Sequence, residues 1–239
     1  MNGSFRAELS FFAIMRLISI KMGVALHNRV RVKVCGITQV QDALACAHMG
    51  VDAIGLVFYE PSPRHVSISQ AQSIVAALPP FITVVGLVVN PSPSMLHTLC
   101  QQVAIDVIQF HGDETPVFCA QHSPRPWFKA LTMHPTLQVE EVATSYYQAG
   151  AQGVLLDAYV KGARGGTGVA FDWERFPQTT KIPYILAGGL NPSNVAQAIA
   201  QTQPWAVDVS SGVESAPGIK DSQAIQTFVL QTHKGARGV

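Results

Sequence analysis

A regular alternation of short apolar stretches and longer amphipathic stretches runs through the chain from residue 30 onward. Eight stretches rich in β-branched residues predict strands, at 30–35, 53–58, 82–89, 106–110, 127–131, 153–157, 183–187 and 206–210. Eight stretches of helical period are expected between and after them, near 39–49, 69–78, 92–102, 114–121, 138–149, 172–177, 191–200 and 220–231. Eight strand–helix units in about 210 residues predict an α/β protein with a single-domain (β/α)8 TIM barrel.

An open, doubly wound sheet would also alternate strands and helices. It would normally carry the glycine-rich turn G-x-G-x-x-G after its first strand, whereas this chain reads C-G-I-T there. We therefore expect one barrel domain over residues 29–233, followed by a polar tail at 234–239. The segment 1–28 is apolar but interrupted by Arg16 and Lys21, and we expect a disordered extension or a start placed upstream of a real one at Met22.

Composition narrows the class of function. Hydrophobic residues make up 48% of the chain and charged residues 13%, which is typical of a globular protein with a large core. A net charge of +1 gives no reason to expect nucleic acid or a membrane as a partner. The four cysteines and eight histidines form no metal-binding pattern, so we expect no metal and reduced thiols in a cytoplasmic protein.

The carboxyl ends of barrel strands carry the active site. Cys35 ends the first strand on the same face as Lys33 and Arg31, which predicts that it points into the barrel mouth; a small buried hydrophobe is the alternative. Asp157 ends the sixth strand and is interpreted as either a turn cap or a catalytic acid or base. The glycine-rich segment after Asp157 is expected to form a mobile lid.

The loops after strands seven and eight are the usual phosphate site of such barrels. Glycines allow the backbone to approach a ligand closely, hydroxyl and amide groups can donate to it, and Asn191-Pro192 predicts the start of a helix. The candidate phosphate-binding residues are Gly188, Gly189, Asn191, Ser210, Ser211 and Gly212.

Three further residues are candidates for substrate binding. His111 lies at the end of strand four, where a histidine satisfied by its neighbours is an equal alternative. Asp208 has the inward parity of strand eight and is expected to orient a polar group of the ligand. Arg64 follows strand two and could pair with a substrate carboxylate, although a lone surface arginine is the default interpretation.

Taken together, six ordered motifs resemble the phosphoribosylanthranilate isomerase family over roughly residues 30–231. They are "KVCGIT" with Asp42-Ala43 after it, "GLVFYEPSPRHVS", "QFHGDE", "LLDAYVKGARGGTGVAFDW", "LAGGLNPSNV" and "VDVSSGVESAPGIKD". The resemblance implies an Amadori rearrangement of an aminoaldose phosphate, a step of tryptophan biosynthesis, without a cofactor. It implies that Cys35 is the base, that Asp157 is the acid, and that Arg64 holds the anthranilate carboxylate.

The resemblance implies a small-molecule substrate, and the sequence leaves open whether the chain is a monomer or a homodimer. Two other functions are compatible with a phosphate-binding barrel. A Schiff-base aldolase of the same fold would use Lys33 or Lys129 as its nucleophile. A non-catalytic barrel that binds a phosphorylated metabolite would keep the phosphate site but has no need of both Cys35 and Asp157.

Overall fold

The computed structural model describes residues 29–158, 173–178 and 181–237. The predicted N-terminal extension and the segment expected to form a lid lie outside these ranges, apart from its first residue, Ala158.

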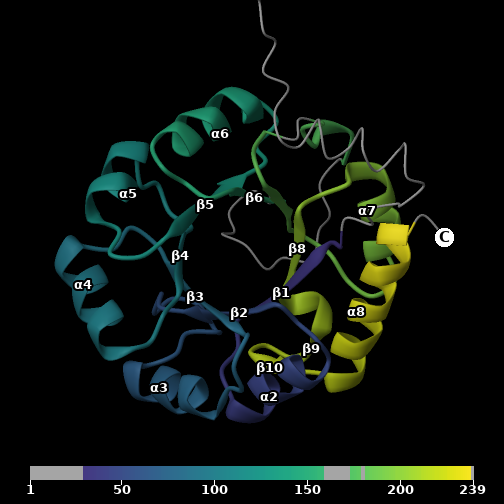
Figure 1. Ribbon diagram of the computed structural model, residues 1–239, viewed down its shortest axis with the longest axis horizontal. Coiled ribbons are helices and arrows are strands. Elements are labelled where there is room, and N and C mark those ends of the chain that lie inside the picture. The colour runs from purple at the N-terminus through teal and green to yellow at the C-terminus, as the bar shows by residue number, and fades with distance from the viewer. Residues whose placement is uncertain (1–28, 159–172, 179–180, 238–239) are drawn as a thin grey trace, which may run out of the picture.

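Eight parallel strands close into one barrel in sequence order, so the predicted fold is confirmed (Figure 1). They are β1 (Arg31–Cys35), β2 (Ala53–Val57), β3 (Thr83–Val88), β4 (Val107–Phe110), β5 (Trp127–Thr132), β6 (Val154–Asp157), β7 (Tyr184–Leu186) and β8 (Ala206–Val209). The barrel closes where β1 pairs with β8, and this register places Lys33 directly beside Asp208.

Helices cover the outside of the barrel (Figure 1). They are α2 (Val40–His48), α3 (Ile68–Ala77), α4 (Pro93–Gln102), α5 (Pro116–His122), α6 (Val139–Gln148), α7 (Val195–Thr202) and α8 (Ser222–Arg237). The sequence sets several starts: Ser67 forms a capping box with Gln70, and Ser92 and Thr115 cap helices that begin with proline. α8 continues to Arg237, into the segment expected as a polar tail.

Two helix predictions are wrong in detail. The helix expected at 172–177 is only a 3-10 turn, η1 (Trp173–Arg175). α7 begins at Val195 rather than beside Pro192, because Asn191 Oδ1 accepts a hydrogen bond from the backbone N–H of Ser193 at 2.8 Å. This local turn takes the asparagine side chain away from a capping role.

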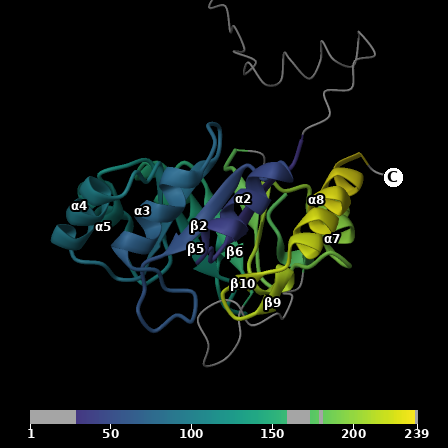
Figure 2. The ribbon, with the colours of Figure 1, turned by 90° about the horizontal axis from the view of Figure 1, so that it is seen from below.

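A second, two-stranded sheet follows β8. After the 3-10 turn η2 (Ser211–Val213), the antiparallel strands β9 (Glu214–Ala216) and β10 (Ile219–Lys220) form a hairpin that leads into α8. Figure 2 shows this hairpin and the loop after β2 extending from the same end of the barrel, where the strands end.

Alternation along the strands divides the core into two parts. The large cluster lies between strands and helices and includes Val32 and Val34 of β1. Inside the barrel a small cluster is built from Val85, Phe128, Ala130, Leu155 and Ala187. The inward positions at the carboxyl ends of several strands are polar, and these form the candidate site.

Candidate active site

Cys35 and Lys33 occupy the inward face of β1, as the sequence predicts. Cys35 is 6% exposed and Lys33 is 5% exposed. Lys33 Nζ donates to Asp208 Oδ1 at 2.8 Å, across the seam between β1 and β8. The positive φ of Gly36, 77°, then turns the chain sharply at the rim. The thiol therefore ends a strand beside a buried ion pair.

This environment acts on the Cys35 thiol in opposing directions. Burial raises the pKa of Cys35 above its ordinary value, Lys33 opposes this shift, and the carboxylate of Asp208 adds to it. Burial alone would lower the pKa of Lys33, but Asp208 and Cys35 outweigh burial and raise it. Lys33 is therefore a permanent cation at neutral pH that favours the thiolate, although burial wins in the protein without substrate.

Asp157 ends β6 beside His111, which follows β4. The distance from His111 Nε2 to Asp157 Oδ2 is 3.4 Å. The amide nitrogen of Gln109 lies 3.1 Å from His111 Nδ1; because an amide nitrogen can only donate, Nδ1 accepts this bond and Nε2 is the ring nitrogen that faces Asp157. Asp157 Oδ1 also accepts the backbone N–H of Ala158 at 2.9 Å. Asp157 therefore makes the capping contact and also faces an imidazole.

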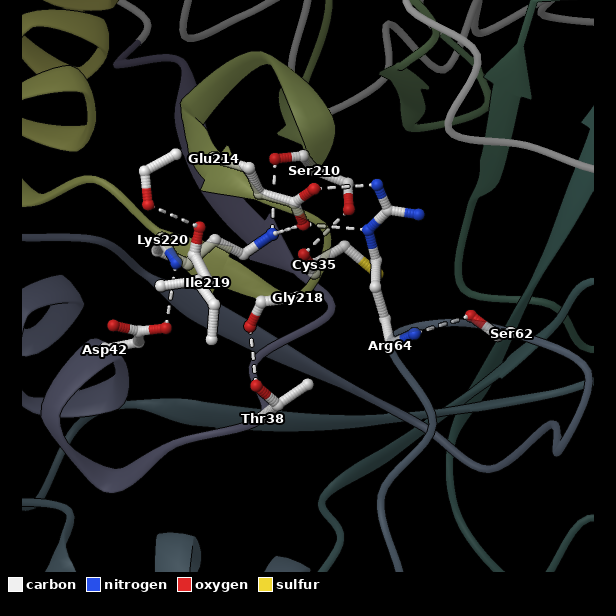
Figure 3. Close-up of polar contacts among 11 residues, drawn as sticks. Cys35, Thr38, Asp42, Ser62, Arg64, Ser210, Glu214, Gly218, Ile219 and Lys220 are labelled. Carbon is white, nitrogen blue, oxygen red and sulfur yellow. Dashed lines mark hydrogen bonds and ion pairs between the residues drawn. The ribbon is translucent and has the colours of Figure 1, made fainter.

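Arg64 is held by a partner that the sequence reasoning missed. Its Nε and Nη2 donate to the two carboxylate oxygens of Glu214, at 2.8 and 2.7 Å (Figure 3). Lys220 Nζ donates to the same carboxylate at 2.7 Å and to the carbonyl of Ser210 at 3.2 Å. The only sequence signal was Pro217-Gly218, a turn dipeptide that pairs Glu214 with Lys220 across a hairpin.

The loops after β7 and β8 meet at the same rim. Gly188 and Gly189 have φ values of 80° and 66°, and a side chain at Gly188 would collide with the backbone of Ala158. A side chain at Gly212 would collide with the carbonyl of Leu190, so the two loops are in contact. Among the described residues, no hydrogen bond uses the N–H groups of Gly188 and Gly189, which leaves both able to donate to an anion.

Other predicted phosphate ligands are engaged within the protein. The backbone N–H of Asn191 donates to Asn194 Oδ1 at 2.9 Å. The hydroxyl of Ser210 donates to the carbonyl of Cys35 at 3.0 Å, which ties the loop after β8 to the end of β1. Ser211 lies in η2, next to Gly212. The backbone N–H groups of Gly188 and Gly189 are therefore better placed to donate to an anion than the backbone N–H of Asn191.

Comparison with known proteins assigns the family. The family model described as N-(5'phosphoribosyl)anthranilate (PRA) isomerase matches residues 32–231. The chain belongs to this family. An N-(5'-phosphoribosyl)anthranilate isomerase of Pseudomonas putida (strain W619) is 54% identical over 202 residues, which cover 84% of this chain and 97% of that protein.

Solved structures agree. A phosphoribosyl anthranilate isomerase in complex with reduced 1-(o-carboxyphenylamino)-1-deoxyribulose 5-phosphate is 36% identical, with a TM-score of 0.72 over 88% of this chain and 100% of that one. Monomers of the dimeric enzyme from Thermotoga maritima are 34% identical, with a TM-score of 0.69 and the same coverage. The resemblance found in the sequence is confirmed, and the chain is an isomerase of tryptophan biosynthesis.

Neither Lys33 nor Lys129 of the isomerase is suited to aldolase chemistry. Lys33 is committed to Asp208. Lys129 points away from the barrel interior: it is 2% exposed, and its Nζ lies 3.3 Å from Glu114 and 2.7 Å from the carbonyl of Gly112. Burial lowers the pKa of Lys129, but a substrate inside the barrel cannot reach its amine.

Within 29–158, 173–178 and 181–237, no group of three or more His, Cys, Asp or Glu side chains could hold a metal ion. No helix in these ranges is long and apolar enough to cross a membrane.

Proposed function

We propose that this isomerase converts N-(5-phosphoribosyl)anthranilate to 1-(2-carboxyphenylamino)-1-deoxyribulose 5-phosphate by general acid–base catalysis, with Cys35 as base and Asp157 as acid. One observation carries the proposal. Cys35 and Asp157 end two different strands on the inward face of the barrel, and each has its own electrostatic partner, Lys33 for the thiol and His111 for the carboxyl group. Both family motifs are thus intact and suitably surrounded.

In the first step, Asp157 in its acid form donates a proton to the furanose ring oxygen. The C1–O bond breaks, and the substrate's own nitrogen forms a protonated Schiff base with C1. His111 contacts Asp157 and keeps its carboxyl group oriented. Because the imine comes from the substrate, this route needs neither a catalytic lysine nor a cofactor.

In the second step, the Cys35 thiolate removes the proton from C2 of the sugar. The electron pair of that C–H bond neutralises the iminium nitrogen and gives an enolamine, which tautomerises to the aminoketose. Lys33 favours the thiolate form, and Asp208 fixes Lys33 in place. We also assign to Asp208, on the inward face of β8, the role of orienting a polar substrate group.

Arg64 would hold the anthranilate carboxylate, and the loops after β7 and β8 would hold the phosphate. Arg64 uses Nε and Nη2 for Glu214, and no hydrogen bond to another described residue uses Nη1, which would bind the substrate carboxylate. The candidates for the phosphate are Gly188, Gly189, Asn191, Ser210, Ser211 and Gly212, with the glycine N–H groups as principal donors. Two anionic ends bound at separate points would fix the sugar between acid and base.

The roles of acid and base are tested by following the loss of phosphoribosylanthranilate fluorescence. We expect Cys35→Ser and Asp157→Asn each to lower kcat by roughly 10²- to 10⁴-fold, the usual worth of a general acid or base. Cys100→Ser, at another buried thiol on α4, is the matched control and should retain activity. Nearly full turnover by Cys35→Ser would assign the base to another residue, with His111 next to be tested.

We also propose that the isomerase acts in the cytoplasm, since its four cysteines are free thiols. Both a monomer and a homodimer are compatible with the chain, and a homodimer has a precedent in the Thermotoga maritima relative. Light scattering after gel filtration would distinguish the two states.

A further inference from the structure

We propose that Glu214 and Lys220 are positioning residues that hold the Arg64 guanidinium in the orientation that binds the substrate carboxylate. The inference rests on the proposed role of Arg64 and extends it to two residues that do not touch substrate themselves. They would control the Michaelis constant for substrates that carry the carboxylate.

The geometry of the Arg64–Glu214 ion pair fixes the orientation of the guanidinium. Glu214 engages Arg64 through one edge of the guanidinium, with two hydrogen bonds of 2.8 and 2.7 Å. Such a forked pair fixes the plane and rotation of the arginine head group, which a single contact does not. The opposite edge, with both N–H groups of Nη1, is thereby turned in one defined direction.

Glu214 is itself held in a fixed position. Its side chain is 5% exposed and that of Lys220 is 0% exposed. Lys220 Nζ fixes one carboxylate oxygen from the other strand of the hairpin, and the backbone N–H of Lys220 donates to buried Asp42 at 2.9 Å. The hairpin turn is tied down as well, because Thr38 Oγ1 donates to the carbonyl of Gly218 at 2.5 Å (Figure 3).

The charges of the three side chains also fit this role. Arg64 and Lys220 both donate to a single carboxylate. Burial lowers the pKa of Lys220 and Glu214 opposes this shift, whereas the bond to Glu214 raises the pKa of Arg64, which stays a cation. Although burial opposes it, the bonds from Arg64 and Lys220 lower the pKa of Glu214, which therefore stays ionised near neutral pH. A substrate carboxylate would complete the alternation of charges instead of competing with Glu214.

Arg64 also lies close to Cys35, the proposed base. A side chain at Gly36 would collide with the Arg64 Cδ atom, so the arginine stem lies across the backbone next to Cys35. Arg64 also interacts electrostatically with Cys35. An arginine fixed at this point would place the anthranilate end of the substrate close to the base.

The test compares two substrates: phosphoribosylanthranilate and N-(5-phosphoribosyl)aniline, which lacks the carboxylate. We expect Glu214→Gln to raise the KM for phosphoribosylanthranilate by tenfold or more, with kcat changed by less than threefold. KM for the aniline substrate should stay within twofold of wild type. Glu141→Gln, at an exposed position on α6, is the matched control and should change neither constant.

Arg64→Ala, alone and combined with Glu214→Gln, separates the role proposed for Arg64 from the positioning role proposed for Glu214. Arg64→Ala should show the same carboxylate-selective rise in KM, and adding Glu214→Gln to it should cause no further rise. If Arg64→Ala affects both substrates equally, the role proposed for Arg64 fails and the positioning role fails with it. If Arg64→Ala is selective but Glu214→Gln is not, the positioning role alone is overturned.

Arg64→Lys provides a second test of the inference if Glu214→Gln does not fold. Arg64 is more exposed than Glu214, so its replacement is less disruptive. Lysine keeps the positive charge but cannot form the two parallel hydrogen bonds of the guanidinium. A carboxylate-selective rise in KM would support an oriented guanidinium, and an unchanged KM would show that charge alone suffices and overturn the inference. Thermal unfolding of every variant, followed by circular dichroism, separates loss of fold from loss of binding.

Discussion

Replacing Lys33 by methionine should destabilise the isomerase far more than removing a similar ion pair from its surface. Methionine keeps much of the volume of the lysine stem but leaves the Asp208 carboxylate without its cation. The side chains of this pair are 6% and 9% exposed, and their charged atoms are 2.8 Å apart. At that distance and an effective dielectric constant of about 20, the attraction is about 6 kcal/mol.

Most of that attraction only offsets the cost of removing both groups from water. The net value of the intact pair is therefore small, whereas breaking it leaves a bare buried charge, at a cost of about 3–5 kcal/mol. This is a large part of a total folding free energy of about 5–15 kcal/mol. Burial also raises the pKa of Asp208, so the loss in Lys33→Met should shrink at acid pH as the carboxyl group takes up a proton.

Urea unfolding followed by circular dichroism measures the free energy of unfolding of each variant. The control is Arg29→Met, which breaks the Arg29–Asp52 pair; its atoms are 2.7 Å apart, but its side chains are 58% and 28% exposed. That loss should stay below about 1 kcal/mol. A double variant, Lys33→Met with Asp208→Leu, should be more stable than Lys33→Met alone. Equal losses in the two single methionine variants would refute the burial argument.

Three further predictions concern Cys35, Gly212 and Glu214. Near neutral pH, Lys33→Met should slow the alkylation of Cys35 by iodoacetamide and Asp208→Asn should speed it, because the cation lowers the pKa of the thiol and the carboxylate raises it. Peptide mass spectrometry measures both alkylation rates. Changes of the same sign in the two variants would contradict this prediction. Gly212→Ala should weaken competitive inhibition by inorganic phosphate, since a methyl group there collides with the neighbouring loop; an unchanged inhibition constant would disagree. The lowered pKa of Glu214 means that its ionised form stabilises the fold above about pH 4.5 and that this contribution fades as pH falls below that value. The stability difference between wild type and Glu214→Gln, measured by urea unfolding, should therefore narrow on acidification, and a difference independent of pH would count against it.

The barrel could be predicted from the sequence because each strand and helix is encoded locally. Buried parallel strands are short runs of β-branched residues, and helices such as the one capped by Ser92 begin with a cap followed by proline. The prediction of where α7 begins was wrong for a local reason as well. Asn191-Pro192 has the composition of a helix start, but the asparagine side chain bonds to Ser193 and forms a turn first.

The candidate site was predictable where function follows from position on a strand. Cys35 and Asp157 stand at strand ends with inward parity, and period-two alternation identifies both. Glu214 and Lys220 could not be found in this way, because their importance depends on a hairpin that brings them to Arg64 from far along the chain. The sequence distance from Arg64 to Glu214 is 150 residues, and no local pattern spans it.

The electrostatics of the two halves of the site favour an order of events. Burial keeps the Cys35 thiol protonated in the free enzyme, even though Lys33 and Lys220 both act to lower its pKa. In the proposed mechanism, ring opening by Asp157 would create a further cation, the protonated Schiff base, directly beside the C2 carbon that Cys35 would deprotonate. A cation at that distance favours the thiolate. We therefore expect Cys35 to become an effective base only after Asp157 has acted, so that the acid step prepares the base step.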